Sequence, residues 1–254
     1  PVMLVAGVAA WRGWLAEGGA MPLAVAGHSL GEYSALVAAG VLTLAQAAPL
    51  VRLRAAAMQE AVPVGTGAMA AILGMEASRV IAGCAEAAAS FGTGSTEVVE
   101  AVNFNDPIQT VIAGTKAGVD KACELLKAAG AKRALPLPVS APFHSSLMKP
   151  AAEKLRMALS DVVLAVPQIP VLNNVDVAVQ QDADAIRDAL YRQAFGAVRW
   201  VECVQALKGR GITHIIECGP GKVLAGLTKR IDPELVGAAL FDPATLAETR
   251  ELLA

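Results

Sequence analysis

Aromatic residues are scarce in this chain of 254 residues, at only 4%, although hydrophobic residues make up 55%. The core must therefore consist mainly of alanine, valine, leucine and isoleucine, a composition typical of helices packed on a parallel sheet. A chain of this length can bury the core of one large domain, or of a large and a small domain. We therefore expect an α/β fold.

An excess of charge of one sign is also lacking. The formal net charge is −2, so no overall basic field favours binding to nucleic acid or to an anionic membrane. Residues 33–51 carry no charge and are numerous enough to span a bilayer, but Gly40 and Pro49 divide them. We expect two buried helices at 33–51 rather than a membrane span. We also expect no nucleic-acid partner and no membrane partner. An acidic partner would have to bind a local basic patch.

Cysteine and histidine are too few and too scattered to indicate a metal site. The four cysteines form no CxxC pair, and no histidine lies at metal-ligand spacing from them. Reduced, structural thiols are typical of a cytoplasmic protein. The first residues also lack the basic flank and the uninterrupted apolar run of a signal peptide. We expect no metal, no cofactor and a cytoplasmic location.

Residues 27–31 carry the strongest functional signal, because Ser29 lies there between two glycines. The apolar residues 23–26 before them are typical of a buried strand, and a helix-forming sequence follows. A serine on a sharp strand-to-helix turn is typical of a nucleophile elbow, where we expect that only glycine fits on either side. The N–H of Leu30 would lie at the helix N-terminus and donate to an oxyanion. The pattern predicts Ser29 as a covalent nucleophile.

Three histidines are available as the general base. His28 directly precedes Ser29 on the same turn, so its side chain points away from the hydroxyl. His214 lies in a strand-like alternation, where a structural histidine is the ordinary interpretation. His144 lies on a proline-containing loop after residue 138, and catalytic side chains are common on such loops. We predict His144 as the base. A standard hydrolase triad would also need an acid between Ser29 and His144 in the chain, but most acids there fall within the expected small domain. The group that orients His144 is therefore not identified by these residues.

The middle of the chain predicts a small domain of its own. Its expected elements follow the order βαββαβ, which is typical of a ferredoxin-like domain; they are residues 68–73, 76–89, 99–105, 109–113, 116–129 and 133–137. We expect this domain to cover about residues 65–138 and to be inserted into a larger α/β domain. The larger domain is expected to include helices at 2–17, 44–59, 146–159, 183–195 and 222–231, and strands at 23–26, 169–173 and 214–217.

The ten residues from Gly27, GHSLGEYSAL, resemble the active-site signature of malonyl-CoA:acyl-carrier-protein transacylases of fatty-acid synthesis. The resemblance extends over essentially the whole chain; further matches lie at 58–63, 67–71, 102–105, 142–144, 147–151, 171–175 and 217–222. It implies an α/β-hydrolase-like core with a parallel sheet, residues 1–64 and 139–254, and a ferredoxin-like insertion, residues 65–138. It also implies malonyl-CoA and acyl carrier protein as partners.

The resemblance implies roles for individual residues. Ser29 would carry the malonyl ester, and His144 would be its base. Gln193 matches the family glutamine whose main-chain carbonyl orients that histidine. Arg54 matches the arginine that binds the free malonyl carboxylate, a role for which a guanidinium with two parallel donors is well suited.

Met58 and Phe143 are expected to line the acyl pocket, although both are equally compatible with an ordinary core. The carrier protein of this family is acidic, so we expect it to bind basic residues of this chain, with Lys222, Lys229 and Arg230 as candidates.

The family pattern begins with a strand and a Gly-Gln-Gly turn that have no counterpart in this chain. That turn supplies a second oxyanion donor, and loss of one such donor typically lowers the rate by about 10²–10³. We expect either that this chain, which lacks this N-terminal segment of the pattern, is impaired or inactive by itself, or that the given sequence is incomplete.

Three functions are compatible with these observations. The first is the malonyl transferase; the second is a serine esterase or thioesterase with the same Ser29 and His144; the third is a non-catalytic docking module for a carrier protein. Arg54 favours the transferase, because an esterase needs no residue that binds a carboxylate.

Overall fold

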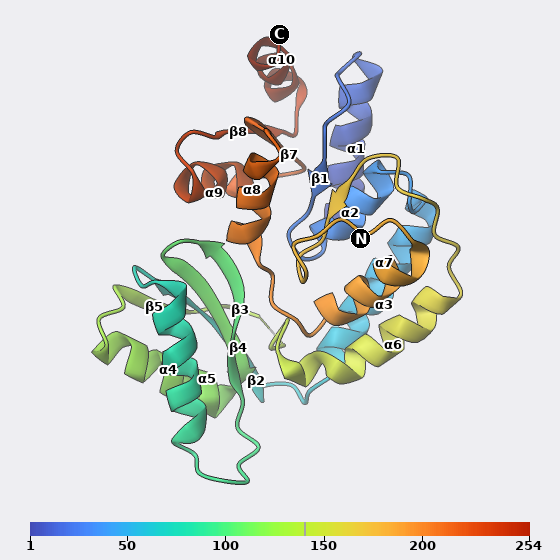
Figure 1. Ribbon diagram of the computed structural model, residues 1–254. Helices are drawn as coiled ribbons and strands as arrows, with labels where there is room; N and C mark the ends of the chain where they lie inside the picture. Colours follow the sequence, from blue (N-terminus) through green and yellow to red (C-terminus); the bar gives the residue numbers. More distant parts are fainter. Residues whose placement is uncertain (140) are drawn as a thin grey trace. The chain divides into compact units, whose positions relative to one another are not determined.

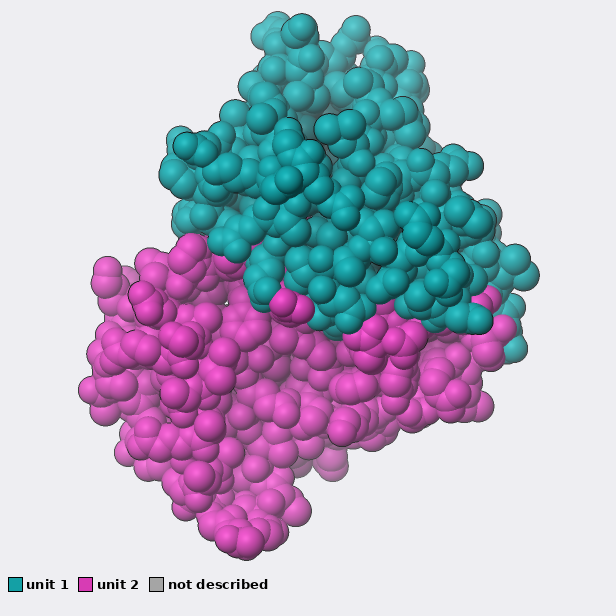
Figure 2. Space-filling model, viewed as in Figure 1, with its two compact units in different colours: residues 1–52, 161–186, 202–254 teal, residues 53–160, 187–201 magenta. Residues whose placement is uncertain are grey.

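The computed structural model (Figure 1) describes residues 1–139 and 141–254. These residues divide into two compact units. Residue 140, in the predicted loop before His144, lies outside the described residues. Figure 2 colours the first unit, residues 1–52, 161–186 and 202–254, in teal and the second, residues 53–160 and 187–201, in magenta. The fold is α/β with parallel and antiparallel strand pairs.

The first unit contains two parallel strand pairs. Strand β1 (Val25–Ala26) pairs with β6 (Val171–Leu172), and β7 (His214–Cys218) pairs with β8 (Val236–Leu240). The helices that lie wholly in this unit are α1 (Val2–Ala16), α2 (Gly31–Ala38), α9 (Val223–Ile231) and α10 (Pro243–Leu252). Helices α3 (Leu44–Glu60), α7 (Ala183–Gln193) and α8 (Trp200–Gly209) contribute residues to both units.

The uncharged stretch at 33–51 forms parts of two helices, as the sequence predicts. Helix α2 ends at Ala38, and Gly40 adopts a φ of 77° that permits the turn before α3. Pro49 lies inside α3. Among the described residues, no helix is long and apolar enough to cross a membrane.

The second unit contains a four-stranded antiparallel sheet with the strand order β3-β4-β2-β5. Its elements follow one another along the chain as β2 (Gly67–Leu73), α4 (Ala77–Ala89), β3 (Val99–Asp106), β4 (Gln109–Thr115), α5 (Lys116–Ala128) and β5 (Arg133–Pro136). The elements expected between residues 68 and 137 are therefore all present, with bounds shifted by one or two residues.

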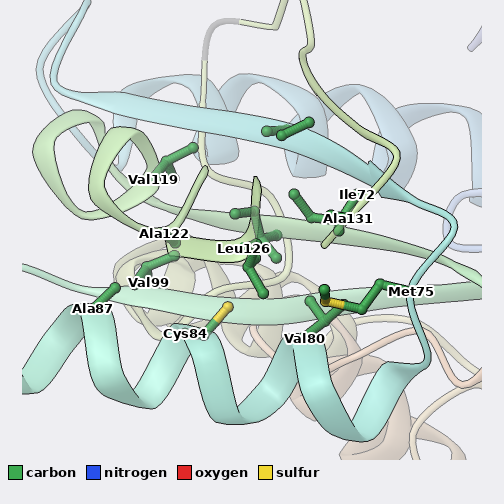
Figure 3. Packing of buried hydrophobic residues seen from close by; sticks show 13 residues of the cluster. Ile72, Met75, Val80, Cys84, Ala87, Val99, Val119, Ala122, Leu126 and Ala131 are labelled. Carbon is green, nitrogen blue, oxygen red and sulfur yellow. The ribbon is translucent and has the colours of Figure 1, made fainter. Parts of the chain in front are cut away.

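Helices α4 and α5 pack on one face of this sheet. Val80 and Cys84 of α4 and Leu126 of α5 meet Ile72 of β2 and Val99 of β3 in a buried cluster (Figure 3). Each fully buried aliphatic side chain stabilises the fold by about 1.5–3 kcal/mol relative to exposure. The opposite face carries a second, smaller cluster: Met69, Val102, Val111 and Ala113. The alternation of the strand residues explains both clusters, because successive side chains point to opposite faces.

Three elements at the C-terminal side were not predicted: α8, β8 and α10. Strand β8 contains Gly237 and two alanines, which have low strand propensity. Gly237 is needed there, because a Cβ atom would lie 2.4 Å from the carbonyl oxygen of Ala225. The predicted helix at 146–159 is a short 3₁₀ turn (Ser146–Met148) followed by α6 (Lys149–Ser160).

Candidate functional site

Ser29 lies on a tight turn between β1 and α2 in the first unit. Its φ is 53°, in the left-handed region that non-glycine residues rarely adopt. The described residues include two other non-glycine residues with positive φ, His144 at 66° and Val177 at 56°. Such conformations cost about 1–3 kcal/mol and are concentrated at functional sites, where surrounding contacts enforce them.

The two glycines of the turn have different roles. A Cβ atom on Gly27 would lie 1.9 Å from the carbonyl carbon of Gly31 and 2.4 Å from the Glu32 nitrogen, so only glycine fits there. A Cβ atom on Gly31 would meet nothing within 4 Å, and this residue has no positive φ. The expectation that glycine is required on both sides is therefore wrong at Gly31, where α2 begins and open space is available.

Leu30 is the N-cap of α2, as expected from the strand-turn-helix pattern. The Gly31 N–H donates to the His28 carbonyl oxygen at 2.9 Å, and the Glu32 N–H donates to the Ser29 carbonyl oxygen at 3.1 Å. Because Leu30 is the N-cap, its N–H lies at the positive end of the helix dipole, where negative charge is favoured. This placement suits a donor to an oxyanion formed at Ser29.

Asn174, two residues beyond the end of β6, holds the turn. Its Oδ1 accepts from the Ser29 N–H at 2.8 Å, and its Nδ2 donates to the Gly27 carbonyl oxygen at 2.8 Å. Its own N–H donates to Oε2 of Glu32 at 2.9 Å. Asn174 is fully buried and Glu32 is 2% exposed. Because β1 and β6 are parallel, residues just beyond their carboxyl ends lie together, and this brings Asn174 to the turn.

His144 is buried in the second unit, and its ring is held by Gln193. The His144 Nδ1 lies 2.9 Å from the main-chain oxygen of Gln193. A carbonyl oxygen only accepts, so Nδ1 carries the proton and Nε2 carries the basic lone pair. Gln193 is the last residue of α7, and the last carbonyls of a helix have no partner within it. The helix end therefore supplies the acceptor.

The loop that carries His144 is fixed on both sides. The Ser145 Oγ donates to the Pro142 carbonyl oxygen at 2.7 Å, and the Ser146 N–H donates to Oε2 of Glu100 at 2.6 Å. Gly67 permits the loop to approach β2, because a Cβ atom at that position would lie 2.4 Å from Cδ of Pro142. These contacts hold His144 in its left-handed conformation.

Arg54 is also buried in the second unit, at 6% exposure. Its Nη2 donates to the side-chain Oε1 of Gln193 at 3.1 Å. Met58 lies one turn further along α3, on the same helix face, and is 2% exposed. Phe143 packs against the smaller cluster of the sheet, so it is at least in part a core residue.

The other histidines lie on the first unit. His214 is part of β7, and its Nδ1 is 2.8 Å from the hydroxyl of Thr213. His28 lies within the tight turn next to Ser29.

All four cysteines are free thiols. Burial raises the pKa of Cys84 to about 12 and that of Cys218 to about 11, so both stay protonated at neutral pH and are poor nucleophiles. In the described part of the chain, no three or more His, Cys, Asp or Glu side chains form a group that would hold a metal ion.

The predicted site residues thus fall into two groups, one in each unit. Ser29 and Leu30 lie together on the turn of the first unit, and His144, Gln193 and Arg54 are linked in the second. The sequence assigns no role to Asn174, which lies only within the family match at 171–175. Its hydrogen bond to Ser29 joins residues 145 positions apart, so no local pattern could have identified it.

The three basic residues predicted to bind a carrier protein lie at the two ends of α9. Lys222 is its N-cap, and Lys229 and Arg230 are in its last turn. All three are exposed.

Comparisons with known proteins all match this chain to acyl transferases. The acyl transferase domain family matches residues 1–230. The malonyl CoA-acyl carrier protein transacylase of Salmonella typhimurium is 53% identical over 247 residues, which are 97% of this chain and 78% of that protein.

Solved structures agree with this match. The crystal structure of an acyl-carrier-protein S-malonyltransferase from Burkholderia pseudomallei has a TM-score of 0.94 at 64% identity, and the match covers 98% of this chain and 79% of that one. A malonyl-transacylase in complex with a type II PKS acyl-carrier protein has a TM-score of 0.94 at 51% identity, with 98% and 79% covered.

Proposed function

The chain belongs to the malonyl CoA-acyl carrier protein transacylase family, and on that premise we propose that it transfers malonyl from coenzyme A to an acyl carrier protein through an ester on Ser29. The acceptor is the thiol of the carrier protein's phosphopantetheine. The reaction is an exchange between two thioesters, with an oxygen ester of the enzyme between them.

In the first half-reaction, the Ser29 Oγ attacks the thioester carbonyl carbon of malonyl-CoA while Nε2 of His144 takes the hydroxyl proton. The Leu30 N–H donates to the oxyanion of the tetrahedral intermediate. The C–S bond then breaks, and the imidazolium returns its proton to the coenzyme A sulfur. The Gln193 carbonyl keeps the proton of His144 on Nδ1, which leaves Nε2 as the base.

The second half-reaction reverses these steps with a different thiol. His144 takes the proton from the pantetheine thiol of the carrier protein, and the sulfur attacks the ester carbonyl carbon. The C–O bond to Ser29 breaks, and the proton passes from His144 to the serine oxygen. Malonyl ends as a thioester on the carrier protein, and the enzyme returns to its starting state.

Arg54 supplies selectivity for an acyl group with a free carboxylate. Its guanidinium is buried, and an acetyl group, unlike malonyl, offers it no carboxylate to bind. Such a loss typically costs a few kcal/mol, which is enough to disfavour acetyl by about 10²-fold.

The observation that carries the proposal is the double contact of Gln193, with His144 through its main chain and with Arg54 through its side chain. A base and a carboxylate-binding group joined by one residue suit an enzyme for acids such as malonyl. A simple esterase requires the base alone, so this pairing favours the transferase.

The finer description of the fold belongs to the same proposal. The strand order β3-β4-β2-β5 with two helices on one face supports a ferredoxin-like domain at residues 65–138, inserted into an α/β-hydrolase-like domain, residues 1–64 and 139–254. The parallel pairs β1-β6 and β7-β8 support the hydrolase-like part. We propose a cytoplasmic location for this enzyme.

The test is acylation by malonyl-CoA, followed by mass spectrometry of the intact protein and its peptides. The unsubstituted protein is expected to gain one malonyl group on the peptide that contains Ser29, and to release it to carrier protein. Ser29→Ala is expected to lose the adduct and to lower transfer by about 10³-fold or more. Ser34→Ala, in the helix α2 that follows the turn, is the matched control and is expected to keep both the adduct and the transfer.

Other outcomes would decide against the proposal. An adduct that persists in Ser29→Ala would place the nucleophile elsewhere. Rapid release of malonate to water without carrier protein would identify a hydrolase instead. Absence of any adduct on the unsubstituted protein, with binding to carrier protein retained, would identify a docking module.

A further inference from the structure

Gln193 makes two contacts of different kinds, and only one of them depends on its side chain. Its main-chain oxygen accepts from Nδ1 of His144, and its side-chain Oε1 accepts from Nη2 of Arg54. Any residue at position 193 supplies a carbonyl oxygen, but few supply a neutral acceptor at the end of a side chain. The orientation of His144 therefore does not explain why the side chain at position 193 is an amide.

The environment makes this contact significant. Gln193 is fully buried, and Arg54 and His144 are 6% and 4% exposed. In such surroundings a hydrogen bond to a charged group is stronger than at the surface, and a long arginine side chain loses much of its rotational freedom when it is held. The bond from Nη2 fixes the plane of the guanidinium at one corner.

The chemical nature of the acceptor is equally important. An amide oxygen orients the guanidinium without neutralising its charge, so the positive charge stays available to a substrate carboxylate. A carboxylate at the same position would form an ion pair with Arg54 and would repel an anionic acyl group. An apolar side chain would remove the hydrogen bond that Gln193 accepts from Nη2 of Arg54.

We propose that the Gln193 side chain is a specificity-determining positioning residue. It holds Arg54 in place while leaving its charge for the acyl carboxylate, and it thereby sets the preference for malonyl over an uncharged acyl group. The inference rests on the proposed function, because it assigns a role within the same site.

Two substitutions test the side chain while the main-chain carbonyl is kept. Gln193→Glu places a competing carboxylate beside Arg54, and Gln193→Met removes the acceptor with little change in size. The ratio of kcat/KM for malonyl-CoA to that for acetyl-CoA is expected to fall about tenfold or more in both, which is the effect of losing one hydrogen bond to a charged group. The fall is expected to be larger for Glu than for Met.

Two further measurements separate this role from a merely structural one. The reaction of Ser29 with a neutral sulfonyl fluoride reports on the nucleophile and its base but not on carboxylate binding, and is expected to change less than threefold in Gln193→Met. The pH profile of that reaction is expected to stay in place in this uncharged variant, because the main-chain acceptor for His144 is kept. Gln59→Glu and Gln59→Met, on an exposed glutamine of α3, are the matched controls.

The outcomes are distinguishable. An unchanged malonyl-to-acetyl ratio in both Gln193 variants would overturn the inference while leaving the proposed function intact. Equal loss of malonyl transfer, acetyl transfer and sulfonyl fluoride reactivity would show that Gln193 acts through His144 or the fold alone. Failure of the unsubstituted protein to form a malonyl ester would overturn the proposed function itself.

Discussion

Both residues proposed to exchange the proton, Ser29 and His144, have a left-handed backbone conformation. Neither has a glycine's freedom, so neighbouring contacts must enforce these conformations. Asn174 does so for Ser29, and the hydrogen bonds of Ser145 and Ser146 do so for His144. The functional side chains thus depend on residues that have no part in the chemistry.

The contribution of Asn174 is testable. Asn174→Ala removes the acceptor for the Ser29 N–H and the donor to the Gly27 carbonyl oxygen. Leaving a buried polar group without a partner typically costs about 1–3 kcal/mol. We expect the free energy of unfolding in urea to fall by about 2 kcal/mol or more, and Ser29 acylation to slow because the turn is held less firmly.

Asn174→Asp tests the Nδ2 donor separately. It keeps the Oδ1 acceptor for the Ser29 N–H but turns a carboxylate oxygen toward the Gly27 carbonyl oxygen, so it is expected to be no more stable than the alanine variant. An alanine variant with unchanged stability and unchanged acylation would show that the hydrogen bonds of Asn174 do not stabilise the Ser29 turn.

At the scale of elements, helix ends supply the groups that the proposed reaction uses. The N-terminal end of α2 presents the Leu30 N–H, and the C-terminal end of α7 presents the Gln193 carbonyl. Helix ends carry backbone groups without partners inside the helix, so they can bind an oxyanion or an imidazole without breaking a helical hydrogen bond. The positions where these helices end are therefore as important as the side chains nearby.

One helix end in the second unit gives a prediction about stability. Thr115 is the N-cap of α5, and its hydroxyl accepts from the Gly118 N–H at 3.3 Å while also contacting Glu97 and Val98. Thr115→Val keeps the shape and removes these bonds, so we expect the free energy of unfolding to fall by about 1–2 kcal/mol.

Thr115→Ser keeps the hydroxyl and is expected to recover most of this loss in the same urea titration. If the serine variant were as unstable as the valine variant, packing of the threonine methyl group rather than the cap would explain the result.

At the scale of the whole molecule, the small net charge makes local charge decisive for an acidic carrier protein. Lys229 and Arg230 are exposed in the last turn of α9. Lys229→Glu is expected to weaken carrier-protein binding several-fold at low salt, and added salt is expected to reduce the difference, because exposed charges are screened within about 10 Å at 0.1 M salt. Calorimetric titration at two ionic strengths measures both effects.

Lys127→Glu is the matched control, since Lys127 is also a lysine in the last turn of a helix, α5. Equal weakening in both variants would indicate a general charge effect and would decide against α9 as the docking helix.

The local parts of the fold could be predicted from the sequence, and the reasons are physical. The glycines and the serine of the turn, the alternation in β2 and the helical periodicity of α4 and α5 are all local patterns. Strand β8 and helices α8 and α10 were not predicted. In β8 the close approach of Ala225 of α9 requires glycine at position 237, so tertiary packing outweighs a weak strand propensity.

By itself, the sequence determined that Ser29 lies on a strand-to-helix turn and that His144 is the best candidate for its base. Its resemblance to a family singled out Arg54 and Gln193. Only the tertiary structure decided that Asn174 holds the Ser29 turn and that the Gln193 side chain meets Arg54. These contacts join residues 145 and 139 positions apart. Periodicity and propensity act over a few residues, whereas such contacts exist only once strands and helices have packed together.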